Sequence, residues 1–362
     1  MKAPLAFRPA TDADRDEWQA FLERHASGDF LHDWAWASVA ELDGQPQRRF
    51  VLTEDSRPVA IAAAQARQLA GGRSFWYVPH GPVLEYAADE ASRRVAATLD
   101  GLRDAGRRER AIAVKIEPRV EAGAPELFAL SGHRLRPTPG TLQVAQTRIV
   151  ELNADDEKML AGFDKDTRYS VRRAEREGVT VRVIREAEDL RAIDALHQLV
   201  EATQQRAGFP MPPLARYRAA WSALAGAGRA RILEARVGDE LMASGMLVVE
   251  GGRSFYLFSG SRREAVGEQK RYASYALQWA MMRDARDSGV RYHDLWGIAP
   301  HDAGPDHPWH GVGLFKKGFG GREVTWAGSW DLVIDPNMYR LREATSIMRR
   351  AVARLRPGRA HG

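Results

Sequence analysis

The chain has 362 residues, of which 44% are hydrophobic and 28% charged, so it carries enough apolar material for roughly two or three folded domains. It contains no cysteine, which excludes disulfides, thiolate nucleophiles and cysteine-ligated metals. The formal net charge of +5 comes mostly from arginine and suits a polyanionic partner such as nucleic acid or a phosphorylated substrate.

Neither a membrane span nor a metal site is predicted. No stretch approaches the roughly 18–20 apolar residues that cross a bilayer. The N-terminus turns acidic before the apolar region of a signal peptide develops. The ten histidines show no tight ligand spacing. We therefore expect a cytoplasmic protein without a transmembrane segment, a bound metal or a cofactor.

The first part of the chain predicts a helix, a short helix, an antiparallel meander, another helix and a further strand. The helix over 12–25 is amphipathic, with Trp18, Phe21 and Leu22 on one face and Thr11 as a suitable N-cap. The elements that follow it are a helix at 35–42, strands at 50–53 and 57–65, a strand within 76–83 that ends in a His-Gly-Pro turn, a helix at 91–105 and a strand at 111–116.

The same order of elements recurs in the second part of the chain. The pentapeptide Gly-Gly-Arg-Ser-Phe at 71–75 is repeated identically at 251–255. Strand-like segments precede both copies, and each copy is followed by a helix that a glycine closes and by another strand. In the second copy this helix is at 272–287 and the strand at 292–296. We infer two copies of one α/β unit of about 180 residues.

Two helices at the start of the second unit carry arginines that could meet an anion. Arg168, Arg172 and Arg176 recur every fourth residue in the helix over 166–177, so they form one basic ridge, although a solvated face paired with glutamates gives the same pattern. Arg206 ends the helix over 187–207, where it could offer a guanidinium to a phosphate or simply complement the helix dipole.

The domain boundaries follow from a linker-like segment between the two units and from a C-terminal segment that is expected to pack on the first unit. A segment rich in proline and glycine at 137–140 precedes a β-like stretch at 146–150, which marks the join. The last strand, at 330–334, and a basic amphipathic helix at 339–355 are expected to return to the first unit. We therefore predict a first domain of residues 1–148 plus 329–362 and a second domain of residues 149–328.

The segment at 311–321 is the strongest candidate for chemistry. Phe315 and Phe319 are four residues apart, so one helical turn places both on one face while Lys316 or Lys317 points into a cleft. A lysine held in this way can neutralise a developing oxyanion or a phosphate. The alternative is a glycine-rich hairpin with solvated lysines. Because the chain has no GxSxG elbow, P-loop or GxGxxG motif, we predict group transfer without a covalent intermediate.

Motifs in family order along nearly the whole chain resemble the Fem family of peptidoglycan bridge-forming aminoacyltransferases. The most specific pair of motifs is Asp294-Leu-Trp-Gly-Ile298 followed by Phe315-Lys-Lys-Gly-Phe-Gly-Gly321. The weaker matches are at 30–36, 76–83, 167–179, 205–209, 256–261 and 275–279. The resemblance implies an α/β (α+β) fold of two tandem GNAT-like domains, each with a mixed, mainly antiparallel sheet flanked by helices.

The resemblance also implies a reaction and its residues. An amino acid would pass from aminoacyl-tRNA to an amine on the stem peptide of a peptidoglycan precursor, either UDP-linked or lipid-linked, with a peripheral contact at the inner membrane face. The residues carried over are Lys316, Phe315 and Asp294 for catalysis, Arg206, Tyr256, Phe258, Trp36 and Lys317 for substrate binding, and Arg168, Arg172 and Arg176 for tRNA. Asp294 is expected either to relay a proton or to cap a strand.

One departure from the family pattern and two alternative functions remain open. Relatives that bind the nucleotide-linked precursor tend to carry a lysine where this chain has Ala37-Ser-Val-Ala40, which puts UDP-linked recognition in doubt. An acyl-CoA-dependent N-acyltransferase would use the same fold, but neither 266–271 nor 82–86 carries its pyrophosphate-binding string. A non-catalytic protein that binds tRNA or a cell-wall precursor is the second alternative.

Overall fold

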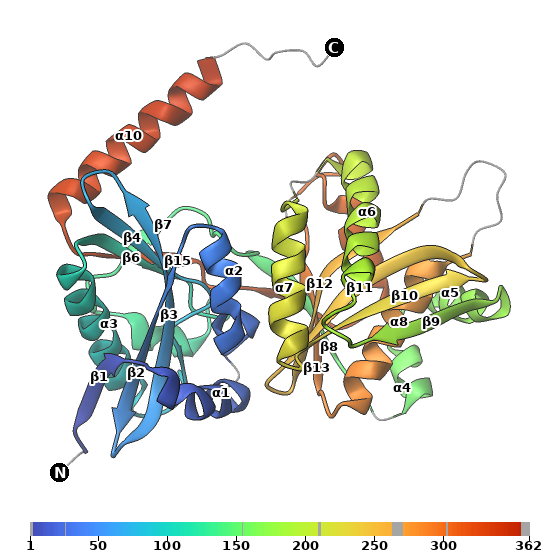
Figure 1. Cartoon of the computed structure of the whole chain (residues 1–362), viewed down its shortest axis with the longest axis horizontal. Coiled ribbons are helices and arrows are strands. Elements are labelled where there is room, and N and C mark those ends of the chain that lie inside the picture. Colours follow the sequence, from blue (N-terminus) through green and yellow to red (C-terminus); the bar gives the residue numbers. More distant parts are fainter. Residues whose placement is uncertain are drawn as a thin grey trace.

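Two α/β halves lie side by side in the computed structural model, each built on one sheet with helices against it (Figure 1). The structure describes residues 3–25, 27–153, 155–208, 211–262, 271–301 and 303–355, and gives the backbone alone at 206, 207 and 346–355. The predicted fold class of two mixed, mainly antiparallel sheets flanked by helices is confirmed.

The first sheet has the order β1-β2-β3-β4-β6-β15-β7, with β5 pairing on β3. All its neighbours are antiparallel except β4 and β6, which are parallel across the helix α3. The strands are β1 (Leu5–Pro9), β2 (Gln47–Glu54), β3 (Arg57–Leu69), β4 (Arg73–Val78), β5 (Val83–Leu84), β6 (Ala111–Ile116), β7 (Arg136–Thr138) and β15 (Ser329–Val333). The helices are α1 (Arg15–Arg24), α2 (Ala37–Leu42), α3 (Ala91–Arg108) and α10 (Pro336–Leu355), with 3-10 turns at Phe30–His32 and Trp34–Trp36.

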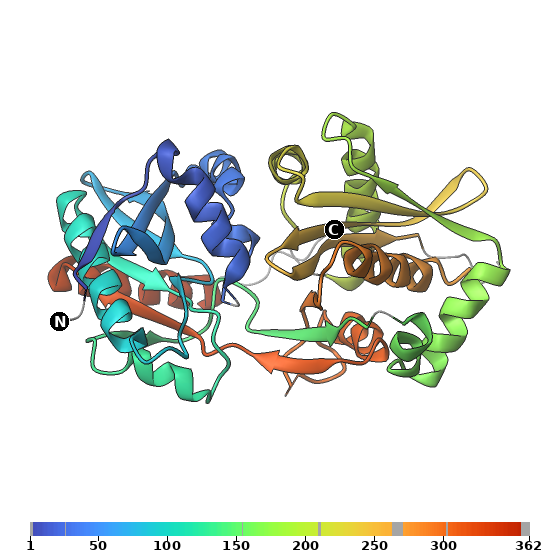
Figure 2. The same cartoon turned by 90° about the horizontal axis from the view of Figure 1, so that it is seen from below.

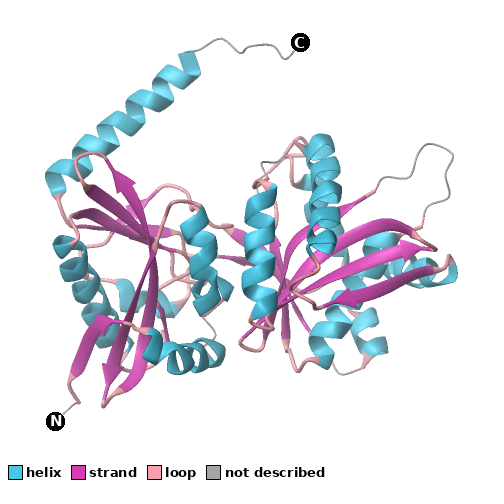
Figure 3. Ribbon diagram, in the orientation of Figure 1, coloured by secondary structure: helices cyan, strands magenta, loops and turns pink. Residues whose placement is uncertain are grey.

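The second sheet has the order β14-β8-β13-β12-β11-β10-β9, again with one parallel pair, β12 and β13. Its strands are β8 (Gln146–Glu151), β9 (Val179–Ile184), β10 (Ala230–Val237), β11 (Glu240–Glu250), β12 (Arg253–Ser261), β13 (Tyr292–Gly297) and β14 (Arg322–Thr325). The helices are α4 (Asp156–Ala161), α5 (Lys165–Arg176), α6 (Leu190–Ala207), α7 (Leu214–Gly226), α8 (Ala273–Asp287) and α9 (His310–Gly318). Helices α6 and α7 lie on one face of this sheet and α8 lies on the other (Figures 2 and 3).

The repeated pentapeptide forms the same turn in both halves. Gly71 and Gly72 join β3 to β4, and Gly251 and Gly252 join β11 to β12; all four have positive φ, between 55° and 73°. Glycine adopts this conformation without the steric cost that a Cβ brings. Gly251 has a second reason to lack a side chain, because a Cβ there would lie 2.8 Å from the backbone oxygen of Glu23 in the first half.

Several sequence-based boundaries differ from the structure. The strand expected to end in the His-Gly-Pro turn at 80–82 already ends at Val78, and His80 takes φ 46° in the turn before the short β5 begins. The predicted domain boundary at 148/149 cuts through β8, all of which pairs in the second sheet, so the pairing places the division before Gln146. The return of β15 to the first sheet supports the other proposed boundary.

A shared apolar cluster joins the two halves. Phe30, Leu31, Trp36 and Val39 of the first half pack with residues of α6, α7 and β12 in one buried core. Trp36 is 3% exposed and stands edge-on to Phe30, at 5.1 Å between ring centroids. Because a core of this kind resists relative movement, the halves form one packed unit.

Candidate active site

A largely apolar cavity of about 410 Å³ opens in the second half, near the junction with the first. Its walls come from β12, α7, the end of β13 and helix α9. Residues that line it include Tyr217, Tyr256, Phe258, Trp296, Phe315 and Lys316. Concave, mainly apolar sites with a few polar groups are the usual form of small-molecule pockets.

Helix α9 brings one lysine to this cavity and turns the next away from it. The segment is helical, which decides between the two sequence-based alternatives in favour of the helix. Phe319 is fully buried, and Phe315 packs edge-on to it at 5.1 Å and to Tyr275 at 5.2 Å. Because successive residues of a helix point about 100° apart, Lys316 is buried while Lys317 is exposed and does not line the cavity.

Lys316 is held by a backbone carbonyl and lies in an apolar setting. Its Nζ donates a hydrogen bond to the carbonyl oxygen of Gly297 at 2.6 Å and lies 5.8 Å from the centre of the Tyr256 ring. Burial lowers the pKa of Lys316 to about 7, although the Asp294 carboxylate opposes this by favouring the charged form. The amine therefore changes charge near neutral pH.

The Gly297 carbonyl is aimed by a β-bulge at the end of β13. The register of β13 against β8 shifts between Asp294 and Gly297, and Trp296 within this shift has φ 61°. A left-handed conformation costs energy for a residue other than glycine, and such strain gathers at functional sites. The Trp296 N–H donates to Asp294 Oδ1 at 2.8 Å, which stabilises the bulge.

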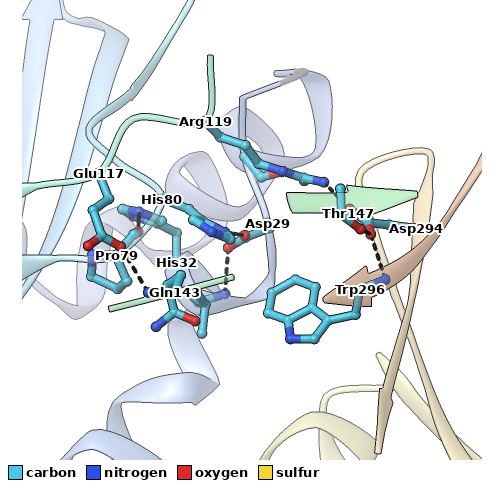
Figure 4. Close-up of polar contacts among 12 residues, drawn as sticks. Asp29, His32, Pro79, His80, Glu117, Arg119, Gln143, Thr147, Asp294 and Trp296 are labelled. Carbon is cyan, nitrogen blue, oxygen red and sulfur yellow. Dashed lines mark hydrogen bonds and ion pairs between the residues drawn. The ribbon is translucent and has the colours of Figure 1, made fainter. Parts of the chain in front are cut away.

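Asp294 is fully engaged in structural contacts. Its carboxylate also accepts hydrogen bonds from the Thr147 hydroxyl and from the Arg119 guanidinium, and it is 2% exposed (Figure 4). Asp294 does not line the cavity, so the structure favours the strand-capping role over proton relay.

First-half residues form a second buried polar network beside the bulge. Asp29 accepts a hydrogen bond from His80, and His32 Nε2 lies 2.8 Å from the Pro79 carbonyl oxygen (Figure 4). Burial opposes ionisation of Asp29, but His80 outweighs it, so the pKa of Asp29 is lowered. The His80 ring stands 5.7 Å from that of Trp296. Neither this network nor Arg119 was predicted, because no local pattern links its members.

Other predicted site residues are divided between the cavity and the scaffold. Tyr256 and Phe258 line the cavity, with Phe258 stacked on Tyr217 at 4.1 Å. Trp36, which was predicted to contact substrate, does not line the cavity, because its ring is enclosed in the core between the halves. The side chain of Arg206 lies outside the described residues.

The predicted basic ridge on α5 is only partly free. Arg168 donates to the Phe163 carbonyl oxygen, which fixes it against the protein, whereas Arg172 and Arg176 are exposed. Arg172 also pairs with Glu157 at 3.2 Å. The described part of the chain contains no helix long and apolar enough to cross a membrane.

Comparison with known proteins agrees with this architecture. Residues 13–125 match the model of the FemAB family, and residues 161–307 match that of the acetyltransferase (GNAT) domain. The lipid II:glycine glycyltransferase of Staphylococcus aureus (strain USA300) is 23% identical, with 90% of this chain and 93% of that protein covered. The crystal structure of FemX aligns with a TM-score of 0.80 at 21% identity, covering 93% of this chain and 99% of that one. L-PGS from Bacillus licheniformis aligns at 0.54 and 14% identity, covering 94% and 97%.

Proposed function

We propose that this chain, which is similar to Fem-type proteins over 90% of its length and has their two-domain fold, transfers an amino acid from aminoacyl-tRNA to a stem-peptide amine of a peptidoglycan precursor. The observation that carries the proposal is Lys316, a buried amine at the wall of an apolar cavity. The name of the lipid II:glycine glycyltransferase relative and the lack of a lysine at 37–40 both favour a lipid-linked acceptor over a UDP-linked one.

The chemistry needs one proton to be moved and one charge to be stabilised. The amine nitrogen attacks the ester carbonyl, an amide bond forms, and the ribose oxygen leaves with a proton. The neutral form of Lys316 accepts the proton of the attacking amine, and its ammonium form then stabilises the oxyanion and protonates the leaving oxygen. A group whose pKa lies near 7 is well matched to both steps.

The remaining cavity residues hold the reactants against Lys316. Tyr256, Phe258 and Phe315 supply apolar walls, which exclude water from the ester and orient the acceptor peptide. Because the ester is already activated, positioning and charge stabilisation are sufficient without a covalent intermediate.

The donor RNA fits best on the exposed side of α5. Tyr169 is 47% exposed, and the Arg173 guanidinium lies 5.8 Å from its ring and 5.6 Å from that of Tyr272. Tyr272 neighbours Tyr275, which contacts Phe315 at the cavity. Aromatic rings interleaved with arginine are what single-stranded nucleic acid binds, so this row suits the unpaired 3′ end of a tRNA.

One incubation tests the reaction. The protein is mixed with a pool of charged tRNAs and either the lipid-linked or the UDP-linked precursor, and the product is read by mass. We expect the lipid-linked precursor to gain the mass of one amino-acid residue. Lys316→Met should lower the rate by about 10²–10³, the usual effect of losing one oxyanion donor. The neighbouring exposed Lys317→Met is the matched control and should keep the wild-type rate.

Three outcomes would contradict the proposal or a part of it. Transfer from acetyl-CoA, with none from charged tRNA, would assign the fold to N-acyl transfer. Binding of tRNA or precursor without any product, unchanged in Lys316→Met, would indicate a non-catalytic binding protein. A wild-type rate in Lys316→Met would remove the lysine from the mechanism.

A further inference from the structure

Arg119 is a first-half residue at the far end of a continuous chain of contacts that reaches Lys316. It follows β6, and its side chain is fully enclosed, with 0% of its surface exposed. It lies between the rings of Phe255 and Trp326, at 5.0 and 4.9 Å from their centres. A cation in such surroundings needs a partner, because burial of an unpaired charge is costly.

The partner of Arg119 belongs to the other half. Its guanidinium donates to Asp294 Oδ2 at 2.5 Å, so this ion pair crosses the junction (Figure 4). The second oxygen of Asp294 accepts hydrogen bonds from Thr147 and from the Trp296 N–H. Arg119 therefore fixes the carboxylate that caps the bulge.

The bulge in turn sets the position of the carbonyl that holds the lysine. Trp296 keeps its left-handed backbone while its ring is clamped by Phe30 of the first half, at 5.4 Å, and by Phe255 of the second, at 5.9 Å. The next residue is Gly297, whose carbonyl oxygen accepts the Lys316 hydrogen bond at 2.6 Å. Each link is a direct contact, from the first half to the cavity wall.

We propose that Arg119 is a positioning residue for Lys316: through Asp294 and the bulge, the first half of the molecule fixes where the reactive amine lies and which charge it faces. The proposal rests on the proposed role of Lys316, and it gives a part in the chemistry to the first half, which supplies none of the described residues that line the cavity. Among the described contacts Arg119 makes no hydrogen bond or ion pair with Lys316, so it acts through Asp294 and through Phe255, whose ring packs against that of Trp296.

The charges around Lys316 determine what the loss of Arg119 should do. Asp294 and the neutral His293 of β13 face the Lys316 amine, and so does the Tyr256 ring of β12. Lys317, the neighbour of Lys316 on α9, points to solvent. Of these groups, Asp294 alone is an anion. Arg119 neutralises part of its charge, so Asp294 attracts a proton to Lys316 more strongly once Arg119 is gone.

The test reads the charge of Lys316 without needing any transfer activity. Lys316 is labelled with a small amine-reactive anhydride over a range of pH, and the modified peptide is quantified by mass spectrometry, because only the neutral amine reacts. In Arg119→Met the pH midpoint of Lys316 labelling should rise by about one unit or more, because the Asp294 carboxylate, no longer paired, raises the pKa of the nearby amine by about this amount. In Asp294→Asn the midpoint should instead fall. Arg119→Lys keeps the charge and should restore most of the wild-type midpoint.

A matched variant separates the relay from a general weakening of the junction. Arg216 of α7 pairs with Asp43 of α2 across the same junction but makes no contact with the relay, so Arg216→Met should leave the midpoint unchanged. In the transfer assay, Arg119→Met should lower kcat at least tenfold with little change in KM for the acceptor. Equal midpoints in wild type, Arg119→Met and Asp294→Asn, with all three folded, would overturn the proposal. The labelling experiment needs no aminoacyl donor, so it can refute the role of Arg119 whether or not the proposed reaction is correct.

Discussion

Replacement of Gly318 by alanine offers a sharp test of how α9 is held. A Cβ at this last residue of the helix would lie 2.2 Å from the Thr167 hydroxyl oxygen of α5, far inside the ordinary contact distance. The helix must therefore move by roughly an ångström, or Thr167 must be displaced. Overpacking of this kind typically costs about 1–3 kcal/mol, which outweighs the ~1 kcal/mol that alanine gains over glycine in a helix. The net loss, up to about 2 kcal/mol, corresponds for a domain of this size to a fall in Tm of up to roughly 8 °C.

The activity should fall further than the stability, because Lys316 lies two residues earlier on the same helix. A misplacement of about 1 Å can cost on the order of 10² in rate. The assays are thermal unfolding and the transfer reaction, each on Gly318→Ala, Thr167→Ala and the double variant. Thr167→Ala removes the clashing oxygen, so the double variant should recover most of both losses. If Gly318→Ala matched wild type, or if the double variant were no better than the single one, the packing argument would be wrong.

Three further outcomes follow from the structure. Glu250 is buried at the junction, where burial and then Asp33 raise the pKa of its carboxyl to about 9. The folded protein therefore keeps a proton that the unfolded chain loses above about pH 4.5, so the wild type becomes less stable as the pH rises from 5 to 8. Glu250→Gln cannot lose this proton, so its free energy of unfolding, measured by denaturant titration, should fall less over the same range. Tyr169→Ala should weaken the binding of a single-stranded RNA ending in the tRNA 3′ sequence by at least tenfold in fluorescence anisotropy, whereas the exposed Phe128→Ala of the first half should not; equal affinities would exclude stacking on α5. Gly260→Ala places a Cβ 2.3 Å from the backbone of α6, so it should cost about 1–3 kcal/mol and raise KM for the acceptor, and an unchanged KM would show that this wall does not contact it.

Much of the fold was accessible from local pattern. The paired glycines of the repeated pentapeptide predicted two equivalent turns, and both have the positive φ that only glycine adopts easily. Helix α7 was missed for an equally local reason. It packs against α6 and α2, and its exposed positions are Ala215, Arg218, Ser222 and Gly226, so only two polar side chains contrast with the buried Tyr217, Trp221 and Leu224 and the amphipathic period is weak.

Part of the candidate site could be predicted from the sequence, and the residues that could not be predicted are joined by contacts between distant parts of the chain. The glycine and aromatic spacing predicted that one lysine of the pair at 316 and 317 would face a cleft, but it could not tell which one until the helix was placed. Arg119 and Asp294 are 175 residues apart, so no window of sequence joins them. Trp36 is a large aromatic residue in a motif, and pattern alone does not distinguish a ring in the core from a ring that faces substrate.

The path of the chain between the two sheets has a consequence for biosynthesis. Strand β15 lies between β6 and β7 in the first sheet, yet the whole of the second sheet is encoded before it (Figure 2). During synthesis the first sheet therefore cannot be completed until residues 329–333 emerge from the ribosome, whereas the second domain, which is synthesised earlier, can already fold. Until then β6 has an unpaired edge, which is a template for wrong pairing. A nascent chain stalled before this strand would expose that edge, which makes the unfinished polypeptide a natural client for ribosome-associated chaperones.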